Sequence, residues 1–100
     1  MLHRIFNLLI VAALFNSPML FAKSNGVLGE ASSCAACHGA NGISPAPIYP
    51  NLAGQKAPYI EQQLKAFRDG KRLSPIMAPM ARELSDQQIS TLANYYSNMK

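Results

Sequence analysis

A chain of 100 residues is long enough for one small domain. Hydrophobic residues make up 49%, but 16 of them lie in residues 1–22, which leaves few large side chains and no Trp for a core. A core this thin needs a disulfide, a metal or a cofactor, which disfavours a self-sufficient enzyme with a deep cleft. The net charge is +4, but the sequence lacks the dense Lys and Arg clusters that are typical of nucleic-acid binders.

Residues 1–22 are typical of a secretory signal peptide, so the mature domain is expected over residues 23–100. Arg4 gives a weakly basic start, residues 5–15 form an apolar run, and Ala22 is a small residue suited to cleavage. The apolar run is too short to cross a bilayer comfortably. We therefore expect export, without stable membrane insertion after cleavage.

The first half of the mature chain predicts two helices separated by a long loop. Residues 27–38 are rich in Ala and favour a short helix. Residues 39–57 contain three Gly and three Pro, which indicates a loop. Residues 58–69 follow as a helix, because Pro suits its first position and Gly70 its end. Its apolar face is formed by Ile60, Leu64 and Phe67.

The second half predicts another loop and one more helix. Pro75 and Pro79 indicate a loop over residues 70–83. Ser85 and Gln88 form a capping-box pattern at the start of a helix that reaches residue 99. The apolar stripe of this helix consists of Ile89, Leu92, Ala93 and Tyr96. No segment alternates like a strand, so the predicted fold is all-α, with about three helices and two long loops.

The two loops are unusually long for so small a domain, and loops of this length are normally functional or disordered. They are poor in charge and rich in Pro, Ala and other apolar residues, which is not the composition of disorder. We therefore expect them to cover an apolar group that the chain itself does not encode.

Both cysteines and the one histidine of the mature chain lie together, as Cys34, Cys37 and His38. The pattern C-x-x-C-H is the attachment signature of haem c. Thiols three residues apart share one helix face and can form thioethers with a porphyrin edge, while the adjacent imidazole binds the iron. Three other interpretations of the motif fit less well. A disulfide between the two cysteines would close a small strained loop, and a thioredoxin-like redox pair needs a preceding strand that the sequence lacks. A zinc site needs four ligands, and the mature chain offers three Cys and His candidates.

A low-spin haem iron also needs a second axial ligand, and no other histidine remains after residue 22. Methionine is a soft thioether ligand that favours ferrous iron. Met99 lies one residue from the C-terminus and is better read as packing. The residues alone leave Met77 and Met80 equally placed as candidates.

Five segments together carry a family resemblance. They are CAACHGANG at 34–42, YPNLAGQ at 49–55, YIEQQLKAFRDGKR at 59–72, MAPM at 77–80 and LSDQQISTLANYY at 84–96. The chain resembles the class I c-type cytochromes, especially one half of the two-haem cytochrome c4 type and its single-haem c553-like relatives. The resemblance implies a small cytochrome c fold of three to four helices, wrapped around one covalently bound haem c.

The resemblance also implies roles for single residues. Cys34 and Cys37 would anchor the haem, and His38 would be the proximal iron ligand. Pro50 matches the family proline whose carbonyl accepts a hydrogen bond from the second histidine nitrogen. Leu52 would pack on the haem face.

For the sixth iron ligand the resemblance favours Met77, with Met80 as the fallback and pocket neighbour. It further implies that the first and last helices cross through a small residue and an aromatic one. Gly29 with Tyr95 or Tyr96 are the matching candidates.

The implied function is that of a periplasmic one-electron carrier between redox proteins, not an enzyme and not a binder of nucleic acid. An alternative is a haem c subunit of a periplasmic dehydrogenase or oxidase. A gas sensor or peroxidase would need an open iron site, against which Met77 and Met80 argue. Six cations either steer acidic redox partners or form an ordinary solvated face: Lys56, Lys65, Arg68, Lys71, Arg72 and Arg82.

Overall fold

The computed structural model describes residues 26–100, and the signal-peptide prediction for residues 1–22 lies outside them. Within the described part the chain is helical and contains no strand, which confirms the all-α prediction. The helices in chain order are α1 (Val27–His38), α2 (Ala57–Arg68), α3 (Met77–Arg82) and α4 (Asp86–Ser97).

The helix α4 forms the centre of the hydrophobic core. Its N-terminus is closed by the predicted capping box, in which the Ser85 hydroxyl accepts from the Gln88 amide and the Gln88 side chain accepts from the Ser85 amide. These two bonds satisfy backbone donors that have no partner inside the helix. The predicted apolar stripe is buried along its whole length, at Ile89, Leu92, Ala93 and Tyr96.

The helix α1 packs on α4 through Ala31, which lies in the same buried cluster as Tyr96. A hydrogen bond of 2.9 Å from Gln88 to the Glu30 carboxylate also joins the two helices. The expectation that Gly29 forms the crossing is wrong, because Gly29 is exposed. Ala31 lies about half a turn further along the helix, on the face that meets α4.

The helix α2 begins and ends one residue earlier than the sequence predicts. Its predicted face is confirmed: Ile60 and Phe67 are buried, and Leu64 packs against the core. After the helix, Gly70 adopts a φ of 76°, a left-handed conformation that favours glycine. The chain then turns back, and the next two amides both donate to the Ala66 carbonyl.

The helix α3 lies inside the segment 70–83 that the sequence predicts as loop, and that part of the prediction is wrong. Pro75 and Pro79 suggested a break, but Pro79 is only the third residue of α3. Amides of the first turn have no partner within a helix, so proline costs little there. The Ser74 hydroxyl accepts from the Met77 amide at 2.9 Å and supports the start of the helix.

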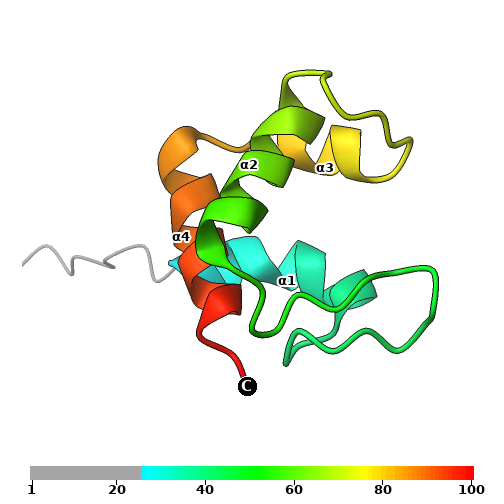
Figure 1. The fold of residues 1–100 in the computed structure, drawn as a ribbon, viewed down its shortest axis with the longest axis vertical. Coiled ribbons are helices and arrows are strands. Elements are labelled where there is room, and N and C mark those ends of the chain that lie inside the picture. Colours follow the sequence, from blue (N-terminus) through cyan, green and yellow to red (C-terminus); the bar gives the residue numbers. More distant parts are fainter. Residues whose placement is uncertain (1–25) are drawn as a thin grey trace, which may run out of the picture.

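The helices pack in a chain of contacts, in which α2 packs on both α3 and α4, and α1 packs on α4. Figure 1 shows α1 and α3 extending to the same side of the α2–α4 pair, with the loop that follows α1 and the segment before α3 beyond them. This arrangement brings the C-terminal end of α1 and the start of α3 to one side of the molecule. No helix within residues 26–100 is long and apolar enough to cross a membrane.

Candidate functional site

The C-terminal end of α1 presents His38, which is the last residue of the helix. Gly39 follows with a φ of 83°, and its amide donates to the Ala35 carbonyl at 2.9 Å. A β-carbon at Gly39 would collide with the Ile43 carbonyl, so the chain can turn away this sharply only at a glycine. The turn leaves the imidazole at the end of the helix, where it is only 6% exposed.

The orientation of the His38 ring is set by one hydrogen bond, of 2.7 Å, between Nδ1 and the Pro50 carbonyl oxygen. A carbonyl can only accept, so Nδ1 carries the proton and Nε2 keeps its lone pair. The imidazole is therefore arranged to bind a metal through Nε2.

The Pro50 carbonyl is held in place by the loop that carries it. The amides of Leu52 and Ala53 both donate to the Gly42 carbonyl, at 2.8 and 3.0 Å. Gly42 has a φ of 73°, and a β-carbon there would lie 2.8 Å from the Ala53 nitrogen. The segments around Gly42 and Ala53 thus approach so closely that only glycine fits at position 42. Leu52 itself is half-buried and packs against the core of the protein.

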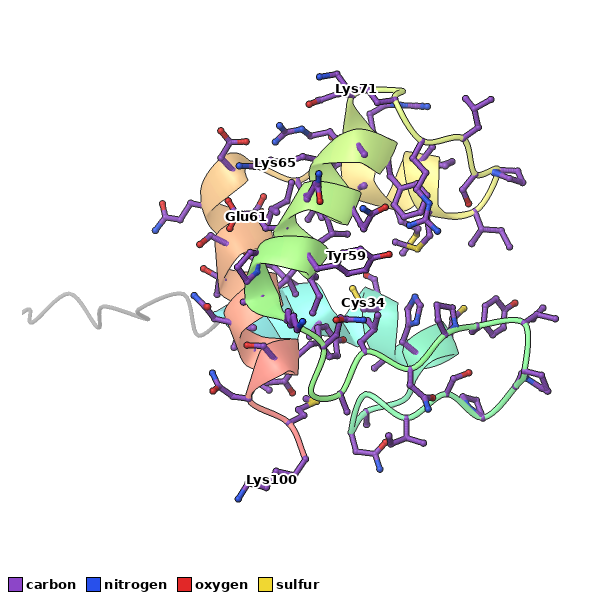
Figure 2. All side chains as sticks on the ribbon, viewed as in Figure 1. Cys34, Tyr59, Glu61, Lys65, Lys71 and Lys100 are labelled. Carbon is purple, nitrogen blue, oxygen red and sulfur yellow. The ribbon has the colours of Figure 1, made fainter. Side chains whose placement is uncertain are left out.

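Cys34 and Cys37 lie one turn apart on α1, and both are free thiols that are half-buried. Figure 2 shows Cys34 near the centre of the molecule. Its thiol makes one long contact of 3.8 Å with the Glu30 carbonyl, and burial raises its pKa. Because neither thiol is in a disulfide, both are available for covalent attachment.

The three methionines of the mature chain have different surroundings. Met77 is half-buried at the first position of α3, whereas Met80 is 43% exposed. Met99 packs against the hydrophobic core, which confirms its reading as a packing residue. Burial therefore distinguishes Met77 from Met80, which the residues alone do not.

Several large apolar side chains of the two loops are exposed, unlike Leu52. Ile43 and Ile48 are exposed on the first loop, and Leu73 is 91% exposed on the second beside Ile76. The core that the chain builds for itself is small, and three of its eight buried apolar residues are alanine. Both observations fit a domain that packs around a large apolar group.

A metal ion without a porphyrin fits the same residues poorly. Within residues 26–100 no three His, Cys, Asp or Glu side chains converge as a zinc site would require. Two thiols on one helix face, an adjacent imidazole with free Nε2 and a thioether on the same side of the fold suit haem c.

Comparison with protein-family models matches the cytochrome c family over residues 22–100. The chain belongs to the cytochrome c family. Membership, together with the C-x-x-C-H sequence at residues 34–38, shows one covalently bound haem c and a role in electron transfer.

Individual relatives place this cytochrome near the c4 type. It is 51% identical to cytochrome c-554(548) of Halomonas halodenitrificans over 68% of this chain and 86% of the relative. It is 50% identical to the thiosulfate dehydrogenase electron acceptor of Thiomonas intermedia over 71% of this chain and 33% of the relative. The solved cytochrome c4 of Acidithiobacillus ferrooxidans matches with a TM-score of 0.65 and 37% identity, over 67% of this chain and 38% of that one.

This cytochrome thus spans most of one relative but only about a third of the other two. The partners of those longer proteins do not follow from a similarity that covers only part of them.

Sequence reasoning missed two residues that support the site. Ser74 holds the start of α3, and its signal was present, because Ser before Pro75 is typical of a turn in which the hydroxyl accepts from the backbone. Arg68 joins α2 to the segment between α3 and α4. Nothing local marks that contact, because its partners lie 16 and 18 residues away in the chain.

Proposed function

We propose that this cytochrome is a periplasmic single-haem electron carrier, in which Cys34 and Cys37 hold the haem and His38 and Met77 bind its iron. The observation that carries the proposal is the hydrogen bond of 2.7 Å between His38 Nδ1 and the Pro50 carbonyl. It directs the remaining nitrogen of a buried ring toward a ligand and makes that nitrogen more electron-rich.

The haem would supply an iron that gains and loses one electron. The protein would supply the rest of the mechanism. The Pro50 carbonyl keeps the His38 tautomer constant in both redox states. Met77 provides a soft thioether that favours the ferrous state. The apolar loops would exclude water from the haem, and an iron held by both His38 and Met77 would leave no position for a substrate, so no enzymatic turnover is expected.

The spectrum of the haem-loaded protein tests this ligand set. We expect low-spin iron and, in the ferric state, the weak long-wavelength band of an iron–thioether bond. Met77→Ala should abolish that band, and Met80→Ala, three residues along the same helix, is the matched control and should retain it. Retention of the band in Met77→Ala would reject this ligand. High-spin iron that readily binds carbon monoxide in the wild type would reject the carrier itself.

A subunit of a dehydrogenase is the second candidate, supported by the relative from Thiomonas intermedia that is named as an electron acceptor of thiosulfate dehydrogenase. Both candidates use the same haem chemistry and differ in the lifetime of the partner complex. Gel filtration of the extract from the native host would separate them. A free carrier elutes at the small size of a single mature domain, whereas a subunit elutes with a larger chain.

The cations proposed to steer acidic redox partners divide into two groups. Lys65 and Arg68 are engaged, since Lys65 pairs with Glu61 and Arg68 pairs with Asp69 and Asp86. The Arg72 guanidinium lies 4.5 Å above the Phe67 ring and donates to the Gln63 side chain. The exposed cations outside these contacts are Lys56, Lys71 and Arg82.

Lys71 lies at the tip of the turn after α2, as Figure 2 shows. We expect Lys71→Gln to slow electron transfer with an acidic partner more than Lys65→Gln, because Lys65 already has a counter-ion. The rate should also fall steeply with added salt. A rate that is flat in salt would reject steering.

The predicted signal peptide and periplasmic location remain part of the proposal. We expect the purified mature protein to lack residues 1–22 and to appear in the fraction released from the cell envelope. Intact mass and fractionation measure both, and an uncleaved chain in the cytoplasm would contradict them.

A further inference from the structure

The segment that carries Met77 has little support of its own. The helix α3 has six residues and makes its helix contacts with α2. A helix this short has marginal stability by itself, so its position depends on its packing against α2, with Ala81 buried, and on how its two ends are anchored. Ser74 anchors the N-terminal end. The C-terminal end leads into Leu84, whose amide donates to the Ala81 carbonyl at 3.0 Å.

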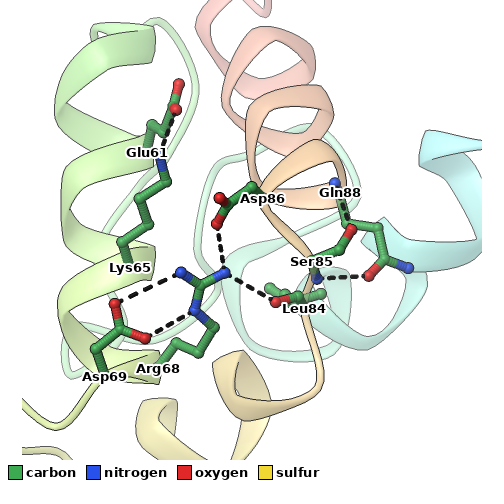
Figure 3. Close-up of polar contacts among 8 residues, drawn as sticks. All are labelled: Glu61, Lys65, Arg68, Asp69, Leu84, Ser85, Asp86 and Gln88. Atoms are coloured by element: carbon green, nitrogen blue, oxygen red, sulfur yellow. Dashed lines mark hydrogen bonds and ion pairs between the residues drawn. The ribbon is translucent and has the colours of Figure 1, made fainter.

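Arg68, at the end of α2, reaches this C-terminal end directly. Its Nη1 donates to the Leu84 carbonyl at 3.2 Å and to the Asp86 carboxylate at 2.7 Å (Figure 3). Its Nε donates to Asp69 at 2.9 Å, which fixes the guanidinium from the side of α2. The Arg68 side chain is 21% exposed and its bond to the Leu84 carbonyl is partly buried, whereas the Asp86 carboxylate is 73% exposed.

We propose that Arg68 is a positioning residue that keeps Met77 on the haem iron by tying the junction of α3 and α4 to α2. The inference rests on the proposed ligand set. One planar guanidinium contacts the Leu84 carbonyl between α3 and α4, the first residue of α4 and Asp69, the residue directly after α2. A lysine cannot make all three contacts, because it lacks the fork of donors.

The histidine side of the site does not depend on this connection. His38 is held by Gly39, by the Pro50 carbonyl and by the packing of α1 on α4. Loss of Arg68 should therefore loosen the methionine side alone. The protein would exchange between a form with Met77 bound and a form with Met77 released, and removal of Arg68 would raise the population of the released form.

Imidazole binding to the ferric haem-loaded protein measures that population. Imidazole takes the sixth position only when Met77 is released, so its apparent affinity scales with the released fraction. We expect Arg68→Gln to bind imidazole about three- to tenfold more tightly than the wild type. Arg68→Lys should bind with intermediate affinity. Asp86→Asn, which weakens one partner and keeps Arg68, should shift the affinity in the same direction by less.

Lys65→Gln is the matched control. Lys65 lies on the same helix and loses the same charge, but its ion pair with Glu61 stays within α2. Its imidazole affinity should equal that of the wild type. Urea unfolding of each variant measures global stability separately.

Three outcomes would overturn the inference. Imidazole affinity in Arg68→Gln could equal that of the wild type, or Lys65→Gln could change it as much as Arg68→Gln does. The change could also follow the urea midpoint across all four variants, as general loosening would. Failure of the proposed ligand set is distinguishable, because the wild type would then lack the thioether band before any Arg68 variant is examined.

Discussion

His38 and Met77 lie on parts of the chain that are supported in different ways. The histidine ends a helix of 12 residues that packs on α4, and a hydrogen bond from a loop fixes its ring. The methionine begins a helix of six residues whose only helix neighbour in the described chain is α2. The helix of the histidine side thus joins the main core cluster through Ala31, whereas the short helix of the methionine side packs on α2 with Ala81 buried outside that cluster.

This difference suggests a division of work between the two sides. A side that is built into the core keeps the haem in place through both redox states. A short helix that packs on one neighbour and is anchored at both ends by hydrogen bonds can be adjusted by single substitutions without unfolding the domain. The following substitutions test the contrast, in order of decreasing expected effect.

The largest effect should come from Leu92→Ala, on the histidine side. Leu92 is 1% exposed and lies in the cluster that joins α1 to α4. The truncation should lower the free energy of unfolding by about 3 kcal/mol, because it removes buried apolar surface and leaves a cavity. Chemical unfolding followed by circular dichroism measures it. Leu73→Ala is the control, since Leu73 is 91% exposed and should change stability little. Equal losses would mean that Leu92 does not carry the core.

Gly42→Ala should give the next largest effect. The added methyl group would lie 2.8 Å from the Ala53 nitrogen, and the alanine backbone would have to adopt the positive φ of Gly42. We expect a loss of about 2 kcal/mol and a weakened bond between His38 and Pro50, which makes the histidine a poorer electron donor to the iron and is visible as a higher reduction potential.

Gly70→Ala is the matched control for this substitution. Gly70 has a similar φ of 76°, but a β-carbon there meets nothing within 4 Å. Its cost should be about 1 kcal/mol, from backbone strain alone, with no change in potential. If both variants behaved alike, the close approach at Gly42 would not matter to the histidine side.

Ser74→Ala tests the methionine side and should cost about 1 kcal/mol or less in global stability, as the loss of a helix cap does. The intensity of the thioether band should nevertheless decrease, because the start of α3 is released. Ser32→Ala is the control, since the Ser32 hydroxyl donates to the Gly29 carbonyl within α1. A weaker band in the control, or an unchanged band in Ser74→Ala, would contradict the assigned role.

The smallest effect is a pH dependence. Hydrogen bonds from Arg68 lower the pKa of Asp69 and Asp86 below the ordinary 3.8. A lowered pKa in the folded state means that the ion pairs stabilise the protein above about pH 4 and that this contribution disappears as the pH falls through the lowered values. The stability difference between wild type and Arg68→Gln should therefore be constant from pH 7 to pH 5 and shrink below pH 4. A difference that persists at pH 2 would mean that the carboxylates are not involved.

Prediction from sequence succeeded where the signal was local. Ser85 and Gln88 are three residues apart, and the capping box that they form defines the start of α4. The first helix was predicted with its observed bounds, and α2 to within one residue at each end. The prediction failed for α3, where Pro79 indicated a loop although its position in the first turn permits a helix.

The haem signature was also local, because two thiols and an imidazole must lie within two turns of one helix to meet a porphyrin edge. Sequence alone could not choose between Met77 and Met80, which lie three residues apart. Their different burial depends on how α3 packs against α2.

The spacing of residues along the chain was therefore enough to predict the cofactor, the all-α class and the helix cap, since each depends on residues within a turn or two of one another. Folding decided that Ala31 rather than Gly29 meets α4 and that Arg68 reaches partners 16 and 18 residues away. The physical reason is that such contacts depend on the angle and rotation at which whole helices pack, and no short stretch of the chain encodes either.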